Sequence, residues 1–114
     1  MLVTVDTTLA VPLGTQIAAG IRGGLVRGEI VAGERLPSAR ALGASLQVNL
    51  HTVLRAYAEL RDEGIIELRR GRGAVVRRNL DPEHTRVREL ARAFVREARS
   101  LGLDPAALLA ESGA

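Results

Sequence analysis

Residues 33–73 read GERLPSARALGASLQVNLHTVLRAYAELRDEGIIELRRGRG, and this stretch decides the fold. Ser38 is a candidate N-cap for a short helix that runs to residue 46. Asn49 is a candidate N-cap for a second helix, which ends at Gly64, a residue that adopts the left-handed C′ conformation easily. Two consecutive helices joined by so short a turn are typical of a helix-turn-helix.

A hairpin is expected directly after the second helix. Two short apolar runs, residues 65–68 and 74–76, flank the basic sequence RRGRG. This pattern predicts two antiparallel strands, with Gly71 and Gly73 supplying positive φ at a basic tip. A helix-turn-helix followed by such a hairpin is a winged helix-turn-helix.

The segments before this stretch complete the domain. Apolar residues at positions 17, 21 and 25 follow a proline, which predicts a first helix over about residues 13–27. Gly20, Gly23 and Gly24 lower its helix propensity, so its stability must come from packing. Residues 28–37 are expected to form an ordered connection, and the opening LVTV, residues 2–5, either a strand or an ordered arm.

Two further helices are predicted beyond the hairpin. Asp81-Pro82 and Asp104-Pro105 each place an N-cap before a proline, which predicts a helix over about residues 82–100 and a last short helix through residues 108–109. Two helices are too few to bury a core alone, so they require a partner. We therefore expect a mainly α fold with a small β-hairpin: a winged helix-turn-helix domain at residues 1–79 and a two-helix dimerisation segment at residues 80–114.

Composition narrows the possible functions. The 114 residues contain no cysteine, which excludes disulfides, zinc-thiolate sites and thiol catalysis. No uncharged run is long enough for a membrane span and no signal peptide is recognisable, so a cytoplasmic protein without membrane contact is expected. Residues 35–80 carry nine arginines and four acidic residues, a net charge of +5, whereas each flank carries −1. This basic middle segment indicates a polyanionic partner.

A helical wheel divides the second helix of the motif into two faces. One sector collects Leu50, Val53, Leu54, Ala56, Tyr57 and Leu60, which we expect to pack inward. The opposite side carries His51, Thr52 and Arg55, where a recognition helix contacts base edges and phosphates. Arg40 lies near the predicted N-terminus of the first helix of the motif, where a positive charge interacts unfavourably with the helix dipole. A bound anion would offset this unfavourable interaction.

Phosphate contacts are expected at both helix starts and at the hairpin tip. Ser38 and Asn49 lie beside free backbone N–H groups. Arg69, Arg70 and Arg72 have the charge and reach to enter a minor groove. Helix caps alone occur in any helical protein. The prediction of phosphate contacts therefore depends on finding the two caps together with the basic hairpin tip.

Other kinds of site are poorly supported. His51 and His84 lie far apart without ligand-spaced partners, so no metal or cofactor is expected. Glu59, Asp62, Glu63 and Glu67 lie among arginines and are interpreted as a solvated charged surface rather than an acid–base pair. The glycines of RRGRG lack the rest of a phosphate loop. No enzymatic activity is expected.

The sequence from Pro12 through residue 76 closely resembles the DNA-binding domain of the GntR family of bacterial transcription regulators. The most telling matches are Gly33-Glu34-Arg35-Leu36-Pro37-Ser38, Thr52-Val53, Ala56-Tyr57, Glu63-Gly64-Ile65-Ile66 and Arg70-Gly71-Arg72-Gly73. The resemblance implies DNA contacts by Ser38 and Arg40, by Asn49, Leu50, His51 and Thr52, and by Arg70, Gly71 and Arg72. Leu50 departs from the polar residue that family members often carry, so either packing or a thymine-methyl contact is expected there in place of a hydrogen bond.

The C-terminal remainder is similar in size to the two-helix extension of the YtrA-type subgroup, whose role is dimerisation. The resemblance implies a homodimer that pairs residues 82–112 across a two-fold axis and binds a short inverted repeat in double-stranded DNA. The dimerisation residues we expect are Val87, Leu90, Ala91, Phe94, Ala98, Leu101, Leu108 and Leu109.

We therefore expect a sequence-specific transcription regulator and, more specifically, a repressor. Release by a small-molecule effector of unknown identity is left open. The alternatives are an architectural, non-specific DNA binder and a winged-helix module that binds proteins.

Overall fold

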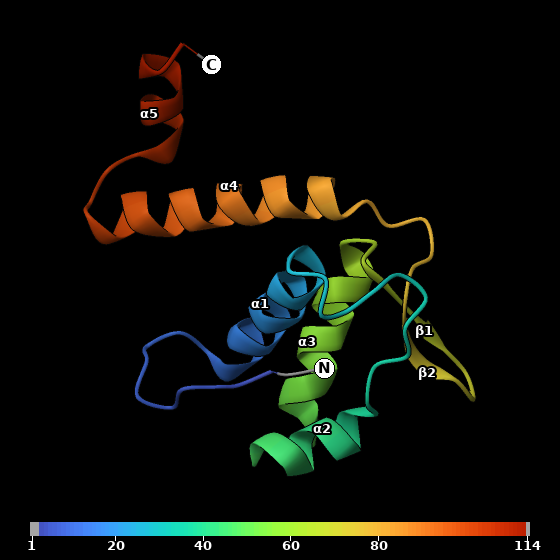
Figure 1. The fold of residues 1–114 in the computed structure, drawn as a ribbon. Coiled ribbons are helices and arrows are strands. Elements are labelled where there is room, and N and C mark those ends of the chain that lie inside the picture. Colours follow the sequence, from blue (N-terminus) through green and yellow to red (C-terminus); the bar gives the residue numbers. More distant parts are fainter. Residues whose placement is uncertain (1–2, 114) are drawn as a thin grey trace.

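The computed structural model describes residues 3–113 and confirms a mainly helical fold with one β-hairpin (Figure 1). The elements in chain order are α1 (Leu13–Val26), α2 (Ala39–Leu46), α3 (Leu50–Asp62), β1 (Ile66–Arg69), β2 (Gly73–Val76), α4 (Pro82–Ser100) and α5 (Pro105–Glu111). The helix bounds agree with the prediction to within two residues, whereas each strand begins one residue away from its predicted start.

The helix starts are fixed by the residues that the sequence indicates. The Ser38 hydroxyl accepts a hydrogen bond of 3.0 Å from the backbone N–H of Ala41, and the Asn49 side chain accepts one of 2.8 Å from that of His51. Asp81 and Asp104 cap α4 and α5 in the same way. Local capping therefore determines where four of the helices described begin.

The turn between α2 and α3 has a left-handed residue that is not glycine. Gln47 adopts a φ of 57° there, a conformation that costs an L residue some free energy. Gly43, in α2, lies close to the next segment, because a Cβ at this position would be 3.0 Å from the carbonyl oxygen of Val48. The two helices approach closely through this glycine, and the turn is correspondingly tight.

The core lies between α1, α3 and the hairpin. Ile17, Ile21 and Leu25 form the buried stripe of α1, as its spacing predicts. The glycines of α1 permit close packing: a Cβ on Gly24 would lie 2.7 Å from the terminal methyl of Ile30. The hydrophobic residues that form the core cluster are Val3, Ile17, Ala18, Ile21, Leu25, Ile30, Leu36, Leu42, Val53, Ala56, Tyr57, Leu60, Ile65, Ile66, Ala74 and Val76.

Two expectations about apolar residues need correction or completion. Leu54 does not pack inward, since its exposed fraction is 44%. It lies at the edge of the predicted apolar sector, where the rest of the described chain leaves it uncovered. Val3 is buried in the core although residues 3–5 form no strand, so the start of the chain is an ordered arm. The first residue of the LVTV stretch, Leu2, lies outside the described residues.

The hairpin gains a third strand-like segment from the connection before α2. Gly33 N–H donates to the carbonyl oxygen of Val76 at 2.9 Å, and Val76 N–H donates to that of Glu34 at 2.8 Å. Leu36 N–H donates to the carbonyl oxygen of Ala74 at 2.9 Å. The predicted ordered connection at residues 28–37 is thus held to the edge of β2, and we call this three-segment unit the wing.

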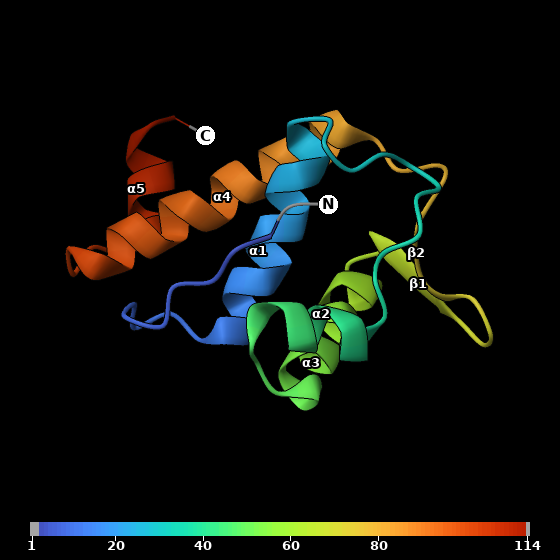
Figure 2. The same cartoon turned by 60° about the horizontal axis from the view of Figure 1, so that its bottom comes forward.

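Helix α4 crosses α1 on the side of the molecule away from α2 and the wing, and α5 turns away from the body (Figures 1 and 2). None of the helices within residues 3–113 combines the length and hydropathy that crossing a bilayer requires. The division near residue 80 stays a prediction, because α4 packs on α1 within the same chain.

Candidate nucleic-acid interface

A buried tyrosine fixes α2 relative to α3. The Tyr57 hydroxyl donates a hydrogen bond of 2.6 Å to the carbonyl oxygen of Pro37, the residue before the N-cap of α2. The tyrosine is otherwise surrounded by the core, and this burial raises the pKa of Tyr57 to about 12. The start of α2 and the recognition helix α3 therefore form one rigid unit.

The predicted base-reading residues lie where α2 and α3 begin. Arg40 and His51 are exposed. Thr52 is half-buried. Its backbone lies against α1, since a Cβ on Gly14 would be 3.4 Å from the Thr52 carbonyl oxygen. Leu50 is half-buried. These residues thus lie in the first turns of α2 and α3, the two helices of the helix-turn-helix.

Leu54 is a surface residue of α3 that the sequence reasoning assigned to the core. It stands one turn after Leu50, so the two leucines share a side of α3. The signal that could have identified it was its position at the border of the apolar sector. The exposed Leu54 beside the half-buried Leu50 on a recognition helix suits contacts with thymine methyl groups.

The side chains of Ser38 and Asn49 are occupied as helix caps. They therefore contribute to an anion site mainly by presenting the first-turn N–H groups of α2 and α3, where the helix dipole also favours negative charge. Their predicted contacts with DNA remain predictions.

The hairpin tip is basic and open. Gly71 and Gly73 have φ values of 80° and 72°, as the sequence predicts. Arg69 is paired with Glu67 at 2.7 Å, whereas Arg70 and Arg72 are exposed and have no acidic partner among residues 3–113. On α2 and α3, Arg40 and Arg55 likewise have none among the described residues. Four arginines of α2, α3 and the hairpin tip are therefore available for an external anion.

The predicted charged surface of α3 contains a buried network instead. Arg22 of α1, with only 2% of its side chain exposed, contacts Glu59 at 3.1 Å, Glu89 of α4 at 3.5 Å and the carboxylate of Glu63. Arg92 of α4 contacts Glu63 at 2.7 Å. Burial alone would lower the pKa of Arg22, but hydrogen bonds to Glu63 and Glu59 outweigh it, and the pKa is raised.

This network corrects the interpretation of Glu63 as part of a solvated surface, whereas Glu59 is exposed as expected, with 44% of its side chain accessible. Glu63 has 17% of its side chain exposed and accepts from arginines of two helices. Asp62 and Glu67 remain at the surface, paired with neighbouring arginines. The network joins α1, α3 and α4, so it fixes the C-terminal helix relative to the recognition helix.

The apolar stripe of α4 is largely uncovered in the single chain. Val87, Leu90 and Leu101 have exposed fractions of 62%, 57% and 71%. Ala91 and Leu109 are exposed as well, and Phe94 and Leu108 are half-buried. Ala98 is the exception, because it is already buried where α4 meets the turn into α5.

No group of histidine, cysteine or acidic side chains within residues 3–113 is arranged to hold a metal ion. His51 and His84 lie on α3 and α4, and neither belongs to a group of three or more such side chains.

Comparison with known proteins identifies related chains. Residues 13–76 match the family described as bacterial regulatory proteins, gntR family. The repressor YtrA of Bacillus subtilis is 30% identical over 108 residues, which cover 90% of this chain and 83% of that protein. The uncharacterised regulator YhcF of the same organism is 35% identical over 96 residues, covering 81% of this chain and 79% of YhcF.

Solved structures agree with these matches. YtrA from Sulfolobus acidocaldarius, a GntR-family transcription factor, has a TM-score of 0.65 and 35% identity, covering 82% of this chain and 97% of that one. The DNA-binding domain of AraR in complex with an operator has a TM-score of 0.56 and 21% identity, covering 67% of this chain and 93% of that one, which shows a shared fold alone.

Proposed function

Because this chain belongs to the GntR family of bacterial regulatory proteins, it is a transcription regulator, and we propose that it acts as a homodimeric repressor on a short inverted repeat in double-stranded DNA. One observation carries this proposal. The arginines without acidic partners belong to α2, α3 and the hairpin, whereas the uncovered apolar stripe belongs to α4, which crosses α1 away from α2 and the hairpin (Figures 1 and 2).

The DNA-binding surface that we propose has two kinds of contact. Arg40, His51 and Thr52 read bases from the starts of α2 and α3, with Leu50 and the newly recognised Leu54 against thymine methyl groups. The remaining residues position the protein on the phosphate backbone through side chains or backbone N–H groups; they are Ser38, Asn49, Arg55, Arg69, Arg70, Gly71 and Arg72. The AraR domain bound to its operator supports this use of the fold.

The homodimer rests on the chemistry of the α4 stripe. Large aliphatic side chains exposed along one helix face are costly in water, and a second copy of the same helix across a two-fold axis covers them symmetrically. Since Ala98 is already buried, we expect the interface to use the other seven predicted residues. A dimer of this kind places two recognition helices about 34 Å apart, one turn of DNA.

We also propose a cytoplasmic location, since a repressor that binds chromosomal DNA in a bacterium works in the cytoplasm. Release from DNA by a small-molecule effector is part of the same proposal. Nothing in α4 or α5 identifies the chemistry of an effector.

Selection from a random-sequence duplex library tests the proposal. The purified chain is expected to enrich an inverted repeat whose half-site centres lie about 34 Å apart along the duplex. Enrichment of no motif, with retention of bulk DNA, would instead identify an architectural binder. Absence of retained DNA at low salt would contradict DNA binding and favour a protein-interaction module.

A further inference from the structure

The outer face of the wing, away from the core, is lined by arginines. Side chains alternate between the two faces of a sheet, and Ile66, Ala74 and Val76 are buried on the inner face. Val75 pairs with Glu67 on one side and bridges to Arg35 on the other. These three residues therefore form one row across the outer face.

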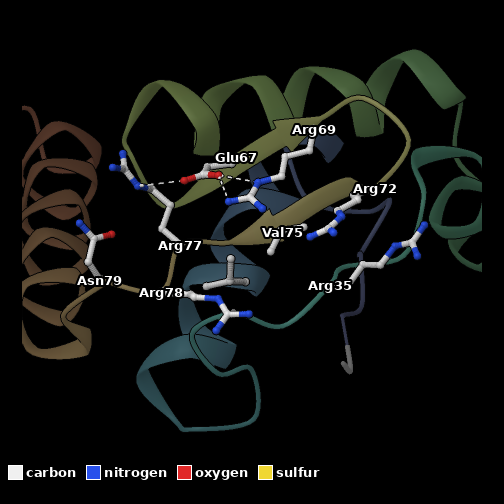
Figure 3. Close-up of a pocket in the computed structure, with 10 residues that line it drawn as sticks. Arg35, Glu67, Arg69, Arg72, Val75, Arg77, Arg78 and Asn79 are labelled. Atoms are coloured by element: carbon white, nitrogen blue, oxygen red, sulfur yellow. Dashed lines mark hydrogen bonds and ion pairs between the residues drawn. The ribbon is translucent and has the colours of Figure 1, made fainter.

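This row is the centre of a concavity of about 510 Å³. We call it the arginine basin and define it by Arg35, Arg69, Arg72, Arg77 and Arg78 around Val75. Figure 3 shows the guanidinium groups of these residues distributed around the Val75 side chain. A volume of this size accommodates a small organic ligand.

The charge of the basin is not balanced from within the chain. Glu67 is the acidic residue of its lining, and it is engaged by Arg69 at 2.7 Å and by Arg77 at 3.9 Å. Arg35, Arg72 and Arg78 have no acidic partner among residues 3–113. Like charges gathered around one concavity repel each other, and a bound anion would offset that repulsion.

The backbone around the basin is held in place. Three hydrogen bonds tie residues 33–36 to β2, and the β1–β2 ladder ties the other side. The backbone of Arg35 is therefore held against β2, and Arg78 follows Arg77, whose N–H donates to the carbonyl oxygen of Ile65 at 3.0 Å. Because the backbone is already ordered, only the arginine side chains lose conformational freedom when a ligand binds.

We propose that the arginine basin is a binding site for a phosphate-bearing anion. Guanidinium groups bind phosphate oxygens with paired, charge-assisted hydrogen bonds, and the basin has unpaired arginines at both ends of β2. Several arginines without acidic partners around one concavity suit a ligand with more than one phosphoryl group. The phosphate comes either from a free phosphorylated small molecule or from the DNA backbone.

The basin shares two residues with the proposed DNA-binding surface. Arg69 and Arg72 line the basin and also belong to the hairpin tip. A free anion that engages them competes with DNA for the same charges, so the two ligands weaken each other's binding by equal factors. This coupling rests on the proposed function, whereas the basin itself does not.

Isothermal titration of the full-length chain with inorganic pyrophosphate at constant ionic strength tests the site. Wild-type protein is expected to bind pyrophosphate, and the double variant Arg35→Ala/Arg78→Ala to bind it at least about tenfold more weakly. The matched control is Arg86→Ala/Arg99→Ala, which removes the same charge from exposed positions of α4. Circular dichroism confirms that both variants fold.

Measuring how the basin variant binds duplex DNA distinguishes the two sources of phosphate. If only pyrophosphate binding is lost in the basin variant, the ligand is a free anion. If pyrophosphate does not bind, but the basin variant lowers the slope of log affinity against log salt on random duplex DNA by about 2, the basin holds DNA phosphates. No pyrophosphate binding and an unchanged slope overturn the proposal. Failure of wild-type DNA binding would refute the proposed function, while the pyrophosphate titration still decides the basin.

Discussion

The Tyr57 hydroxyl donates its hydrogen bond to the carbonyl oxygen of Pro37 at 2.6 Å, and this single contact ties the middle of α3 to the start of α2. Both helix starts carry predicted DNA contacts. The relative position of Arg40 and His51 therefore depends on a bond that neither residue makes.

Ionisation of Tyr57 is expected to require unusually high pH. The chain has one tyrosine and no tryptophan, so tyrosinate absorbance near 295 nm reports this residue alone. We expect a midpoint near pH 12 in the folded protein and near pH 10 in urea. A folded midpoint near pH 10 would show that the hydroxyl is exposed to solvent.

Stability should change in the same pH range. Because the folded pKa is raised, the protonated tyrosine is fully present in both states below pH 10, and the unfolded state ionises first above it. The free energy of unfolding is therefore expected to fall by about 2 kcal/mol between pH 10 and 12. Urea melts of Tyr57→Phe should lack this decrease. At neutral pH the variant should lose about 1 kcal/mol.

Replacing Arg22 should be strongly destabilising. In Arg22→Leu, Glu63, Glu59 and Glu89 lose their shared cation, and we expect a loss of about 3–5 kcal/mol in urea denaturation. The double variant Arg22→Leu/Glu63→Leu should lie closer to wild type, because it removes a charge of each sign. Arg61→Ala is the control, since Arg61 is half exposed beside Asp62. Equal stability of Arg22→Leu and Arg61→Ala would argue against the network.

The apolar stripe of α4 should control assembly. Leu90→Glu places a charge on the exposed stripe, and sedimentation equilibrium is expected to show a shift from dimer to monomer without loss of helix content. Val31→Glu is a suitable control, because Val31 is equally exposed but lies before the wing. A dimer that persists in Leu90→Glu and in Val87→Glu would exclude this face as the interface.

Two arginine variants should distinguish a residue that reads bases from a residue that contacts phosphates. Arg40→Ala is expected to cost about 1–3 kcal/mol on the selected operator and little on random DNA. Arg55→Ala should weaken binding to both and reduce the salt slope by about 1. Equal losses on both DNAs for Arg40→Ala would assign Arg40 to the backbone.

Helix bounds could be predicted because the signals that set them are local. Ser38, Asn49, Asp81 and Asp104 each cap the helix that follows within a few residues. Gly64 ends α3 with a φ of 78°. Such signals are readable from the sequence without knowing the tertiary structure.

The features that were missed depend on contacts between distant segments. The burial of Arg22 requires acids from α3 and α4, and the third segment of the wing requires residues 33–36 to meet β2. Leu54 has the periodicity of a core residue, but no element covers it. The arginine basin, in turn, exists only once the three segments of the wing are paired.

The most direct measurement is fluorescence anisotropy of the purified chain with the DNA upstream of its own coding sequence and with a scrambled duplex, at two salt concentrations. We predict a preference of at least about a thousandfold for the native DNA, with affinity that falls steeply as salt rises. Equal affinity for both duplexes would contradict sequence-specific regulation, and the absence of binding at low salt would contradict DNA binding itself.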